Sequence, residues 1–450
     1  MQFVRHEPLV LLLGDLIVFY AALWLTLLVR YVELPSSIGW WQHAVPFSFL
    51  FLLSVLIYFI VGLYDQHTSF QRSKLPSLVA YGQTATVIFA ALFFFLVPYF
   101  GITPKTILAI FLAISSILMV FWRLVLTRYL GVRGQGRALV VGTGDEMAEL
   151  VQELNAGRYG LTVVEQYAPE DIEVSPQLQE QILEHITRKG ITTLIIDTRN
   201  KHMAQLTPVF YNLIFLHPKL TILDALTLYE NLFRRIPISM LEDMWFIEHI
   251  TRQTPTLYNI YHRAFDVVLS CVLGCVALVL LPFVTLLIWQ YDRGPLFYRQ
   301  RRVGKDNQPL DLIKFRTMTL QREHEVVGEA KNSVTRVGAF LRKTRIDELP
   351  QLWNVLRGGY SLIGPRPELP AYVAAYAEAI PYYNARHLIT PGLSGWAQLN
   401  HHEHPHHDID VEQTRRKLSY DLYYLKHRSL WLDLEIGLKT VKTLLTAVGK

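Results

Sequence analysis

Four long apolar stretches occupy the first third of the chain, near residues 8–29, 43–64, 78–100 and 104–127. Each is about 20 residues long, the length that an α-helix needs to cross the hydrocarbon core of a bilayer. The first stretch is too long for the apolar part of a typical signal peptide, and no small-residue cleavage site follows it. The pattern therefore predicts a bundle of four transmembrane helices over residues 1–130.

Residues 137–235 follow a different pattern, in which short apolar runs alternate with helical stretches. The predicted strands are 137–144, 161–167, 192–197 and 220–224. Strands that alternate with helices are typical of a parallel sheet of the nucleotide-binding type. Gly142 and Gly144 end the first strand, but Met147 occupies the place of the third glycine in a dinucleotide-binding fingerprint. We therefore expect a degenerate Rossmann-like cytoplasmic domain over residues 131–250, structural or regulatory in role, with an anion at the Gly144 turn as the alternative.

A fifth apolar run extends from Phe265 to Trp289 and is long enough to cross the membrane again. Arginine and lysine residues flank both of its ends, and positively charged flanks favour the cytoplasmic face. Pro282 lies inside the run and removes a backbone hydrogen bond there. These features predict a re-entrant helix–break–helix at about residues 264–289, which enters the bilayer and returns to the same face.

The last residues of the chain predict an amphipathic helix. Apolar side chains recur at helical spacing at Leu430, Leu434, Leu438, Val441 and Leu445. Such a stripe lies either on a bilayer surface or against the core of its own domain, and the spacing alone leaves both alternatives open.

The composition supports a membrane protein. Hydrophobic residues make up 51% of the chain and charged residues 18%, a balance that is too apolar for an ordinary soluble enzyme. The formal net charge of +5 favours anionic lipid as a partner, and no nucleic-acid partner is expected because no basic block with interleaved aromatic residues occurs. The lysines and arginines of the connecting segments place both termini and the loop 65–77 on the cytoplasmic side. Cys271 and Cys275 lie inside an apolar run and predict neither a disulfide framework nor a metal site.

The densest group of charged residues lies between residues 341 and 368. Asp347 and Glu348 are predicted to begin a short helix, with Asp347 as its N-cap. Basic residues surround the pair, namely Arg342, Lys343 and Arg345 before it and Arg366, between Pro365 and Pro367, after it. Two carboxylates among fixed cations suit phosphate groups and a divalent metal, because a carboxylate binds Mg²⁺ and arginines bind phosphoryl oxygens. The alternative is a capped, solvated surface helix.

From about residue 258 to its end, the sequence resembles the bacterial sugar transferase family, the monotopic phosphoglycosyl transferases. The motifs that carry the resemblance follow in the family's order: HRAFDVVLS, GPLFYRQRRVGKDN, KFRTM (314–318), RIDELPQLWNVLRGGYSLIGPRPE (345–368), TPGLSGWAQLN (390–400) and YDLYYLKHRSLWLDLEIGLKT (420–440). They cover somewhat under half of the chain. The N-terminal helices and the degenerate α/β domain are similar to the long form of the family, in which the catalytic part comes last.

The resemblance implies that residues 251–450 form an α/β catalytic domain with a re-entrant membrane helix and amphipathic helices, at the cytoplasmic face of a bacterial inner membrane. It implies transfer of a hexose-1-phosphate from a UDP-sugar to polyprenyl phosphate, with release of UMP, as the first membrane step of exopolysaccharide, capsule or O-antigen synthesis. A homo-oligomer is compatible with this assignment, and the sequence does not indicate which sugar is carried.

The same resemblance implies roles for individual residues. Asp347 is expected to attack the sugar-bearing phosphorus and form a covalent intermediate. Glu348 is expected to assist Mg²⁺ binding or to deprotonate the acceptor phosphate, with both carboxylates as candidate metal ligands. The residues expected at the substrate phosphates are Arg342, Arg366, Lys314, Arg316, Pro365 and Pro367. For Lys314 and Arg316 the alternative is a role in anchoring the membrane surface.

The sequence departs from the family's pattern at several positions. Leu281 precedes Pro282 where many relatives have a serine, and Arg345 stands where many have a small polar residue. The histidine-rich run 401–408 lies outside the shared motifs and is either a transition-metal site or a variable solvated loop.

Two other classes of protein fit the sequence less well. A membrane-anchored nucleotide-sugar dehydratase requires a Tyr-x-x-x-Lys pair, which the sequence lacks. A non-catalytic scaffold or regulator of polysaccharide assembly would have no need for Asp347, Glu348, Arg342 and Arg366.

Overall fold

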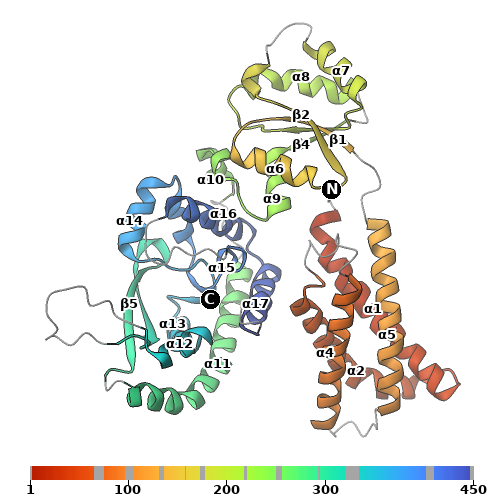
Figure 1. The fold of residues 1–450 in the computed structure, drawn as a ribbon, viewed down its shortest axis with the longest axis vertical. Helices are drawn as coiled ribbons and strands as arrows, with labels where there is room; N and C mark the ends of the chain where they lie inside the picture. Colours follow the sequence, from red (N-terminus) through yellow and green to blue (C-terminus); the bar gives the residue numbers. More distant parts are fainter. Residues whose placement is uncertain are drawn as a thin grey trace. The chain divides into compact units, whose positions relative to one another are not determined.

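A computed structural model describes residues 3–64, 75–96, 105–130, 136–157, 159–172, 178–216, 220–249, 256–291, 294–319, 334–401 and 410–445. The chain divides into two compact units, Met1–Asp224 and Ala225–Lys450 (Figure 1). The first unit contains apolar helices followed by an α/β sheet, and the second contains the charged motifs.

The N-terminal apolar stretches form four helices: α1 (Phe3–Tyr31), α2 (Ser37–Val61), α4 (Leu75–Leu96) and α5 (Lys105–Leu130). Three of them, α1, α2 and α5, contain a segment that is long and apolar enough to cross a membrane. The described apolar segment of α4, Ser77–Ala90, is shorter. The expectation of long apolar helices is thus confirmed.

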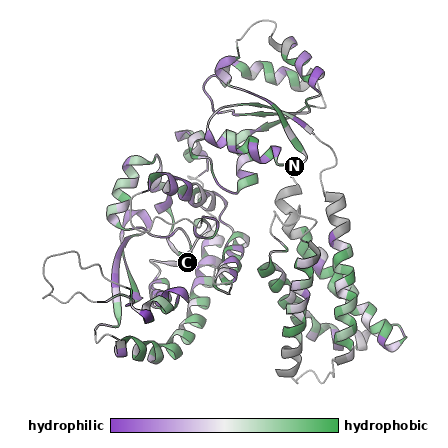
Figure 2. Ribbon diagram, in the orientation of Figure 1, coloured by the Kyte–Doolittle hydropathy of each residue, from purple (hydrophilic) through white to green (hydrophobic). Residues whose placement is uncertain are grey.

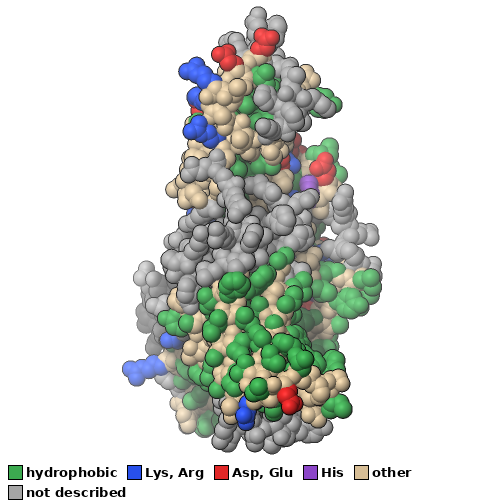
Figure 3. Space-filling view, turned by 90° about the vertical axis from the view of Figure 1, so that its right-hand side faces the viewer, with side chains coloured by type: hydrophobic (Ala, Val, Ile, Leu, Met, Phe, Trp, Pro, Cys, Tyr) green, Lys and Arg blue, Asp and Glu red, His purple; other side chains and the backbone are tan. Residues whose placement is uncertain are grey.

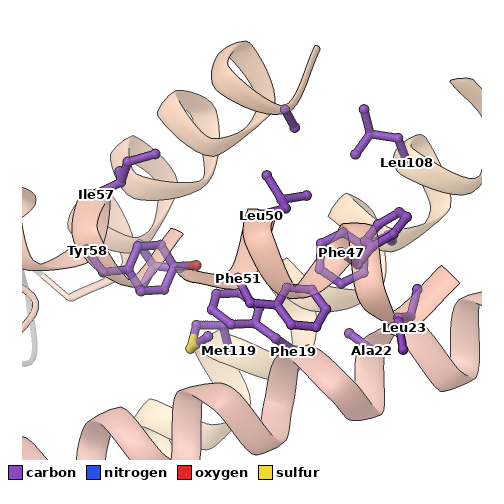
Figure 4. Close-up of a cluster of buried hydrophobic side chains, with 14 of the residues drawn as sticks. Phe19, Ala22, Leu23, Phe47, Leu50, Phe51, Ile57, Tyr58, Leu108 and Met119 are labelled. Atoms are coloured by element: carbon purple, nitrogen blue, oxygen red, sulfur yellow. The ribbon is translucent and has the colours of Figure 1, made fainter. Parts of the chain in front are cut away.

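Aromatic side chains fill the interior of this group of helices. Phe51 stacks on Phe19, with ring centroids 5.3 Å apart, and Phe47 lies in the same cluster (Figure 4). Phe51 also stacks on Phe111 at 5.6 Å, and Phe47 meets Phe111 edge to face. The outer surface is equally apolar, because Ile17, Leu52 and Ile117 are each about 70% exposed and hydrophobic side chains gather on this face (Figure 3). A helix group that is apolar both inside and outside is suited to a lipid environment.

Two buried charged groups within these helices pair with each other. Asp15 of α1 forms a buried ion pair with Arg123 of α5, and Tyr64 donates a hydrogen bond of 2.7 Å to the same carboxylate. Arg123 also donates to the carbonyl oxygen of Leu63, just beyond the end of α2. An unpaired charge would be costly in such apolar surroundings, which explains why these groups are paired. Because the partners lie on or next to α1, α2 and α5, the contacts also join these three helices.

The α/β part of the first unit is a four-stranded parallel sheet. Its strands are β1 (Gly136–Val141), β2 (Leu161–Tyr167), β3 (Thr193–Ile196) and β4 (Thr221–Asp224), and its helices are α6 (Asp145–Asn155), α7 (Leu178–Lys189) and α8 (Met203–Leu216). The strand order β2-β1-β3-β4 with parallel pairing confirms the predicted parallel α/β sheet. Met147 is buried against Gly142, where a Cβ atom would lie 2.4 Å from the Met147 methyl carbon. The methionine therefore fills space that a third glycine would leave open.

The second unit begins with α9 (Ala225–Phe233) and α10 (Asp243–His249) and continues with the long helix α11 (Thr256–Tyr291). An antiparallel hairpin follows, formed by β5 (Phe297–Val303) and β6 (Pro309–Phe315). The next elements are α12 (Arg336–Lys343), the 3₁₀ helix η5 (Ile346–Gln351), α13 (Leu352–Arg357), β7 (Ser361–Ile363), α14 (Pro370–Ala379) and β8 (Gly392–Ser394), which pairs in parallel with β7. The chain then forms α15 (Trp396–Asn400), α16 (Val411–His427) and α17 (Leu430–Leu445).

The segment before α11 packs against elements near the end of the chain. Arg234 forms a bidentate ion pair with Glu435 at 2.6 and 2.8 Å, and the indole of Trp396 donates to the Arg234 carbonyl oxygen. The Ile236 amide donates to the carbonyl oxygen of Ser419. The division at residue 224 thus differs from the predicted boundary at residue 250, because these contacts join residues 225–249 to the second unit.

Helix α11 is apolar along most of its length and is bent into two limbs (Figures 1 and 2). Pro282 lies within it, and the Thr285 hydroxyl donates to the carbonyl oxygen of Leu281 at 2.7 Å. Both features bend helices, since proline lacks an amide donor and a threonine that bonds back to residue i−4 opens the turn. The predicted break is therefore a bend in a continuous helix.

Helix α17 presents its apolar stripe outward. Leu430, Leu434 and Val441 are exposed, whereas Asp433 and Glu435 are buried. The buried carboxylates are satisfied, because Tyr258 and Tyr424 donate to Asp433, and Arg234 pairs with Glu435. The stripe predicted from the sequence is thus not part of the domain's core.

Candidate active site

Asp347 and Glu348 lie in the first turn of η5, between α12 and α13. Both are buried, with 7% and 6% of their surfaces exposed. The expectation that Asp347 is the N-cap of an α-helix is wrong, because Arg345 precedes η5 in a left-handed conformation (φ 57°) and the α-helix begins only at Leu352. Pro350 removes one amide donor here, so the chain forms a 3₁₀ turn before it continues as α13.

Glu348 is surrounded by cations. Its Oε1 lies 3.1 Å from the Lys314 ammonium and 3.0 Å from an Arg366 guanidinium nitrogen, and its Oε2 lies 3.6 Å from Arg345. Burial opposes ionisation of Glu348, but these three positive charges outweigh it and lower the pKa of the carboxyl to about 2. Glu348 is therefore an ionised anchor that fixes the positions of its partners.

Asp347 has a contrasting environment. Its Oδ1 is buried and has no hydrogen-bond partner among the residues that the structure describes. Burial, together with the adjacent negative charge of Glu348, raises its pKa from 3.8 to about 6. At neutral pH the group is thus a poorly solvated carboxylate with a free oxygen, which is the condition in which a carboxylate is most reactive as a nucleophile.

Strand β6 brings Lys314 to the carboxylates. Asn354 of α13 connects the two elements, since its Oδ1 accepts from the Ile313 amide at 3.3 Å and its Nδ2 donates to the Asp311 carbonyl oxygen at 2.8 Å. Burial lowers the pKa of Lys314, although Glu348 partly offsets this effect. The role of Asn354 was not predicted from the sequence. The signal that could have indicated it is a single amide side chain within an otherwise apolar helical run.

The other predicted basic residues surround this centre. Arg342 donates from Nε to the Thr317 hydroxyl at 2.9 Å, and its positive charge offsets a small part of the rise in the pKa of Asp347. Arg316 is buried directly after β6. The structure thus brings Lys314 and Arg366 onto Glu348 and places Arg342 near Asp347.

The turn that carries Arg366 is packed tightly between β7 and β8. A Cβ atom on Gly392 would lie 2.1 Å from the Gly364 amide nitrogen, so no side chain fits there. Pro365 and Pro367 are buried, and their carbonyl oxygens accept from the Gly392 amide and from Arg302. The two prolines shape the turn that holds the arginine.

A second group of buried charges lies behind this turn. Arg386 donates to the Arg366 carbonyl oxygen at 2.9 Å and pairs with Asp421 at 2.7 Å. Lys417 forms an ion pair with Glu368, whose pKa is lowered to about 2 despite its burial. These residues, which the sequence analysis did not single out, fix the main chain that carries Arg366.

The carboxylate pair fits a magnesium ion that is shared with a substrate. No cluster of three histidine, cysteine or acidic side chains occurs within the described part of the chain. Mg²⁺ is commonly bound by one or two carboxylates together with substrate phosphates, and the unpartnered Oδ1 of Asp347 is a suitable ligand atom. The histidine-rich run at 402–408 lies outside the described residues.

The second unit is similar to known proteins. The family model of the bacterial sugar transferases matches residues 257–447. A UDP-glucose:undecaprenyl-phosphate glucose-1-phosphate transferase of Caulobacter vibrioides is 41% identical over 187 residues, which cover 41% of this chain and 69% of that protein. An uncharacterised sugar transferase of Bacillus subtilis is 36% identical over 193 residues, which cover 42% of this chain and 90% of that protein. The chain belongs to the bacterial sugar transferase family.

A longer relative matches over a smaller share of its length. The UDP-N-acetylgalactosamine-undecaprenyl-phosphate N-acetylgalactosaminephosphotransferase of Aeromonas hydrophila is 41% identical over 196 residues. These residues cover 43% of this chain and 45% of the Aeromonas protein. The match of the family model, residues 257–447, lies in the second unit.

Proposed function

We propose that this protein transfers a hexose-1-phosphate from a UDP-sugar to polyprenyl phosphate, yielding UMP and a polyprenyl-diphosphate-linked sugar. The observation that carries the proposal is the contrast between two adjacent carboxylates. Glu348 is held by three cations, whereas Asp347 has a buried oxygen that has no partner in the described part of the chain. Undecaprenyl phosphate is named in the acceptor role for two of the relatives above. The product would begin exopolysaccharide, capsule or O-antigen synthesis.

In the first step, Asp347 attacks the sugar-bearing phosphorus of the donor. A phosphorus–oxygen bond to the aspartyl group forms, and the bond to the leaving UMP breaks. In the second step, an oxygen of polyprenyl phosphate attacks the same phosphorus and releases the carboxylate. Lys314 and Arg366, fixed by Glu348, lie where they can offset the negative charge of the diphosphate. Mg²⁺ held by Asp347 and Glu348 would supply further positive charge when it is bound.

The pH dependence of the reaction should report the ionisation of Asp347. Because its pKa is raised to about 6, the group gains a proton and loses its nucleophilic character as the pH falls below that value. Glu348 stays ionised throughout this range, since its pKa is about 2. We expect kcat/KM for the donor to be about tenfold lower at pH 5 than on its plateau above pH 7. A profile that is flat between pH 5 and pH 7 would contradict this assignment.

We further propose that α11 enters the membrane and returns to the cytoplasmic face. Support comes from contacts between residues before and after the helix. Lys426 pairs with Glu230 at 2.8 Å, and Tyr382 donates to Asp243 at 2.8 Å. Segments joined by such hydrogen bonds lie on one side of a bilayer, so a helix between them does not cross it.

The apolar surfaces of the second unit fit the same placement. Side chains such as Val268, Val272 and Val279 are exposed on α11, and the apolar stripe of α17 is exposed as well. Because water disfavours exposed apolar area of this extent, we infer that both helices contact lipid. The active site would then lie at the level of the lipid head groups, where a prenyl chain can remain in the bilayer.

Cysteine labelling tests this topology. In a background in which Cys271 and Cys275 are replaced by alanine, Glu242→Cys before α11 and Arg299→Cys after it should both react only with a reagent added from the cytoplasmic side. Glu33→Cys, in the loop after α1, is the control that should react from the opposite side. Labelling of the Glu242 and Arg299 positions from opposite sides would show that α11 crosses the membrane.

The proposed activity is tested by measuring UMP release from a panel of UDP-sugars in the presence of polyprenyl phosphate and Mg²⁺. UDP-glucose, UDP-galactose and their N-acetylated forms present the same diphosphate, so the panel also identifies the sugar. Release of UMP from at least one donor, with formation of the lipid-linked product, is the expected result. Absence of release from every donor by folded protein would favour a non-catalytic scaffold.

A further inference from the structure

Two residues of α11 contact the segments that carry the active site. Arg263 donates from Nη1 to the Val355 carbonyl oxygen at 2.5 Å and from Nη2 to the Leu356 carbonyl oxygen at 2.6 Å. These carbonyls belong to the last turn of α13, where carbonyl groups lack the i+4 amide donors of a continuing helix; the Val355 carbonyl also accepts from the Gly358 amide at 2.9 Å. The guanidinium therefore caps the helix that begins directly after η5.

The second residue, Asp266, contacts β7. Its Oδ1 accepts from the Leu362 amide at 2.9 Å and from the Ser361 hydroxyl at 3.1 Å. Asp266 is only 3% exposed, so these hydrogen bonds are shielded from water. Strand β7 leads directly into the turn that carries Arg366, and its position fixes where that turn begins.

Arg263 and Asp266 are three residues apart and lie on the same face of one helical turn. One turn of α11 thus holds the segment with Asp347 and Glu348 through Arg263 and the segment with Arg366 through Asp266. The contact of 3.0 Å between Arg366 and Glu348 joins these same two segments on the side of the substrates.

We propose that Arg263 and Asp266 are positioning residues, which set the distance between the carboxylate pair and Arg366 from the apolar helix α11. This inference rests on the proposed function. It assigns to Arg263 a role different from that of a cation near lipid head groups, since both of its described hydrogen bonds go to main-chain carbonyl oxygens. The position of α11 would consequently influence the distance between the carboxylate pair and Arg366.

The substitution Arg263→Lys separates the two roles. Lysine keeps the positive charge, but its single ammonium cannot reproduce the planar fork that bonds two carbonyls at once. We expect a kcat for UMP release that is about 10- to 100-fold lower, because displacements of about 1 Å have effects of this size, with a smaller change in KM for the donor. Arg263→Gln should have a larger effect on kcat. The matched control is Arg301→Gln, which removes an exposed arginine of β5 and should change kcat by no more than about twofold.

Each result has a defined meaning. An Arg263→Lys protein that reaches the membrane in normal amounts and keeps the parent's kcat would overturn the proposal. If neither Arg263 variant accumulates, Asp266→Ala provides the test, because it withdraws the acceptor from the Leu362 amide; a parent-like kcat there would equally refute the idea. Failure of the proposed function would look different, since the unsubstituted protein would then release no UMP.

Discussion

Replacement of Asp347 by asparagine should abolish UMP release and leave the protein at least as stable as the parent. An amide is a poor nucleophile towards phosphorus, so the rate should fall by a factor on the order of 10⁴ or more. The expected stability of the Asp347→Asn variant follows from the raised pKa of Asp347 in the parent. Because this pKa is raised to about 6, the ionised carboxylate opposes folding at neutral pH, and its removal should raise the free energy of unfolding by up to about 3 kcal/mol.

The measurement combines UMP release with thermal unfolding of the purified protein in detergent. An inactive variant with a lower unfolding temperature would not support the assignment, since its loss of activity could follow from misfolding. Normal turnover by Asp347→Asn would exclude Asp347 as the nucleophile. Arg301→Gln again serves as a control for effects of substitution in the same unit.

Replacement of Glu348 by glutamine should give the opposite result for stability. Glutamine is nearly isosteric but uncharged, so Lys314, Arg345 and Arg366 would lose the carboxylate that pairs with them. The pKa of Glu348 is lowered to about 2, which means that its ionised form stabilises the fold above the pKa of the unfolded chain, near pH 4.5. We expect a loss of about 3 kcal/mol at neutral pH and a decrease in kcat of about 100-fold or more.

The difference between the two variants should depend on pH. As the pH falls towards 2, Glu348 of the parent gains a proton, and the stability advantage of the parent over Glu348→Gln should shrink. Urea unfolding at pH 7 and pH 4 measures this change. If Glu348→Gln were as stable as the parent at pH 7, the ion pairs of Glu348 with the three cations would not stabilise the fold, which would contradict the role given to Glu348.

The sequence predicted the features that depend on composition and periodicity. The length of the apolar runs indicated the membrane helices, and the alternation of short apolar runs with helical stretches indicated the parallel sheet. The density of charge around Asp347 and Glu348 predicts a phosphate site, because so many fixed cations near two carboxylates are unusual in a hydrophobic core, and this site stays a prediction.

The contrast between the environments of the two carboxylates could not be predicted from the sequence. Lys314, Arg345 and Arg366 come from β6, from the residue before η5 and from the turn after β7, and only the folded chain shows that all three contact Glu348. The contacts of Arg263 were unpredictable for the same reason, since its partners lie about 90 residues further along the chain.

Two further features of the fold could not be predicted from the sequence, because they depend on tertiary contacts. Helix α9 follows β4 without any linker that is rich in glycine or proline, so no pattern in the sequence marks the division at residue 224. The apolar stripe of α17 has the same spacing whether it faces a core or a lipid surface, and its exposure is determined by Tyr258 and Tyr424, which bind Asp433 on the other face.

The most direct test of the central claim is to detect the covalent intermediate on Asp347. The protein is incubated with a reactive UDP-sugar and Mg²⁺ without polyprenyl phosphate, digested with trypsin under mildly acidic conditions and analysed by mass spectrometry. Cleavage after Arg345 and Arg357 releases the peptide 346–357, which contains both carboxylates. The account predicts a hexose-phosphate adduct on Asp347 in this peptide, which disappears when the acceptor is added. An active protein whose peptide 346–357 remains unmodified under these conditions would contradict it.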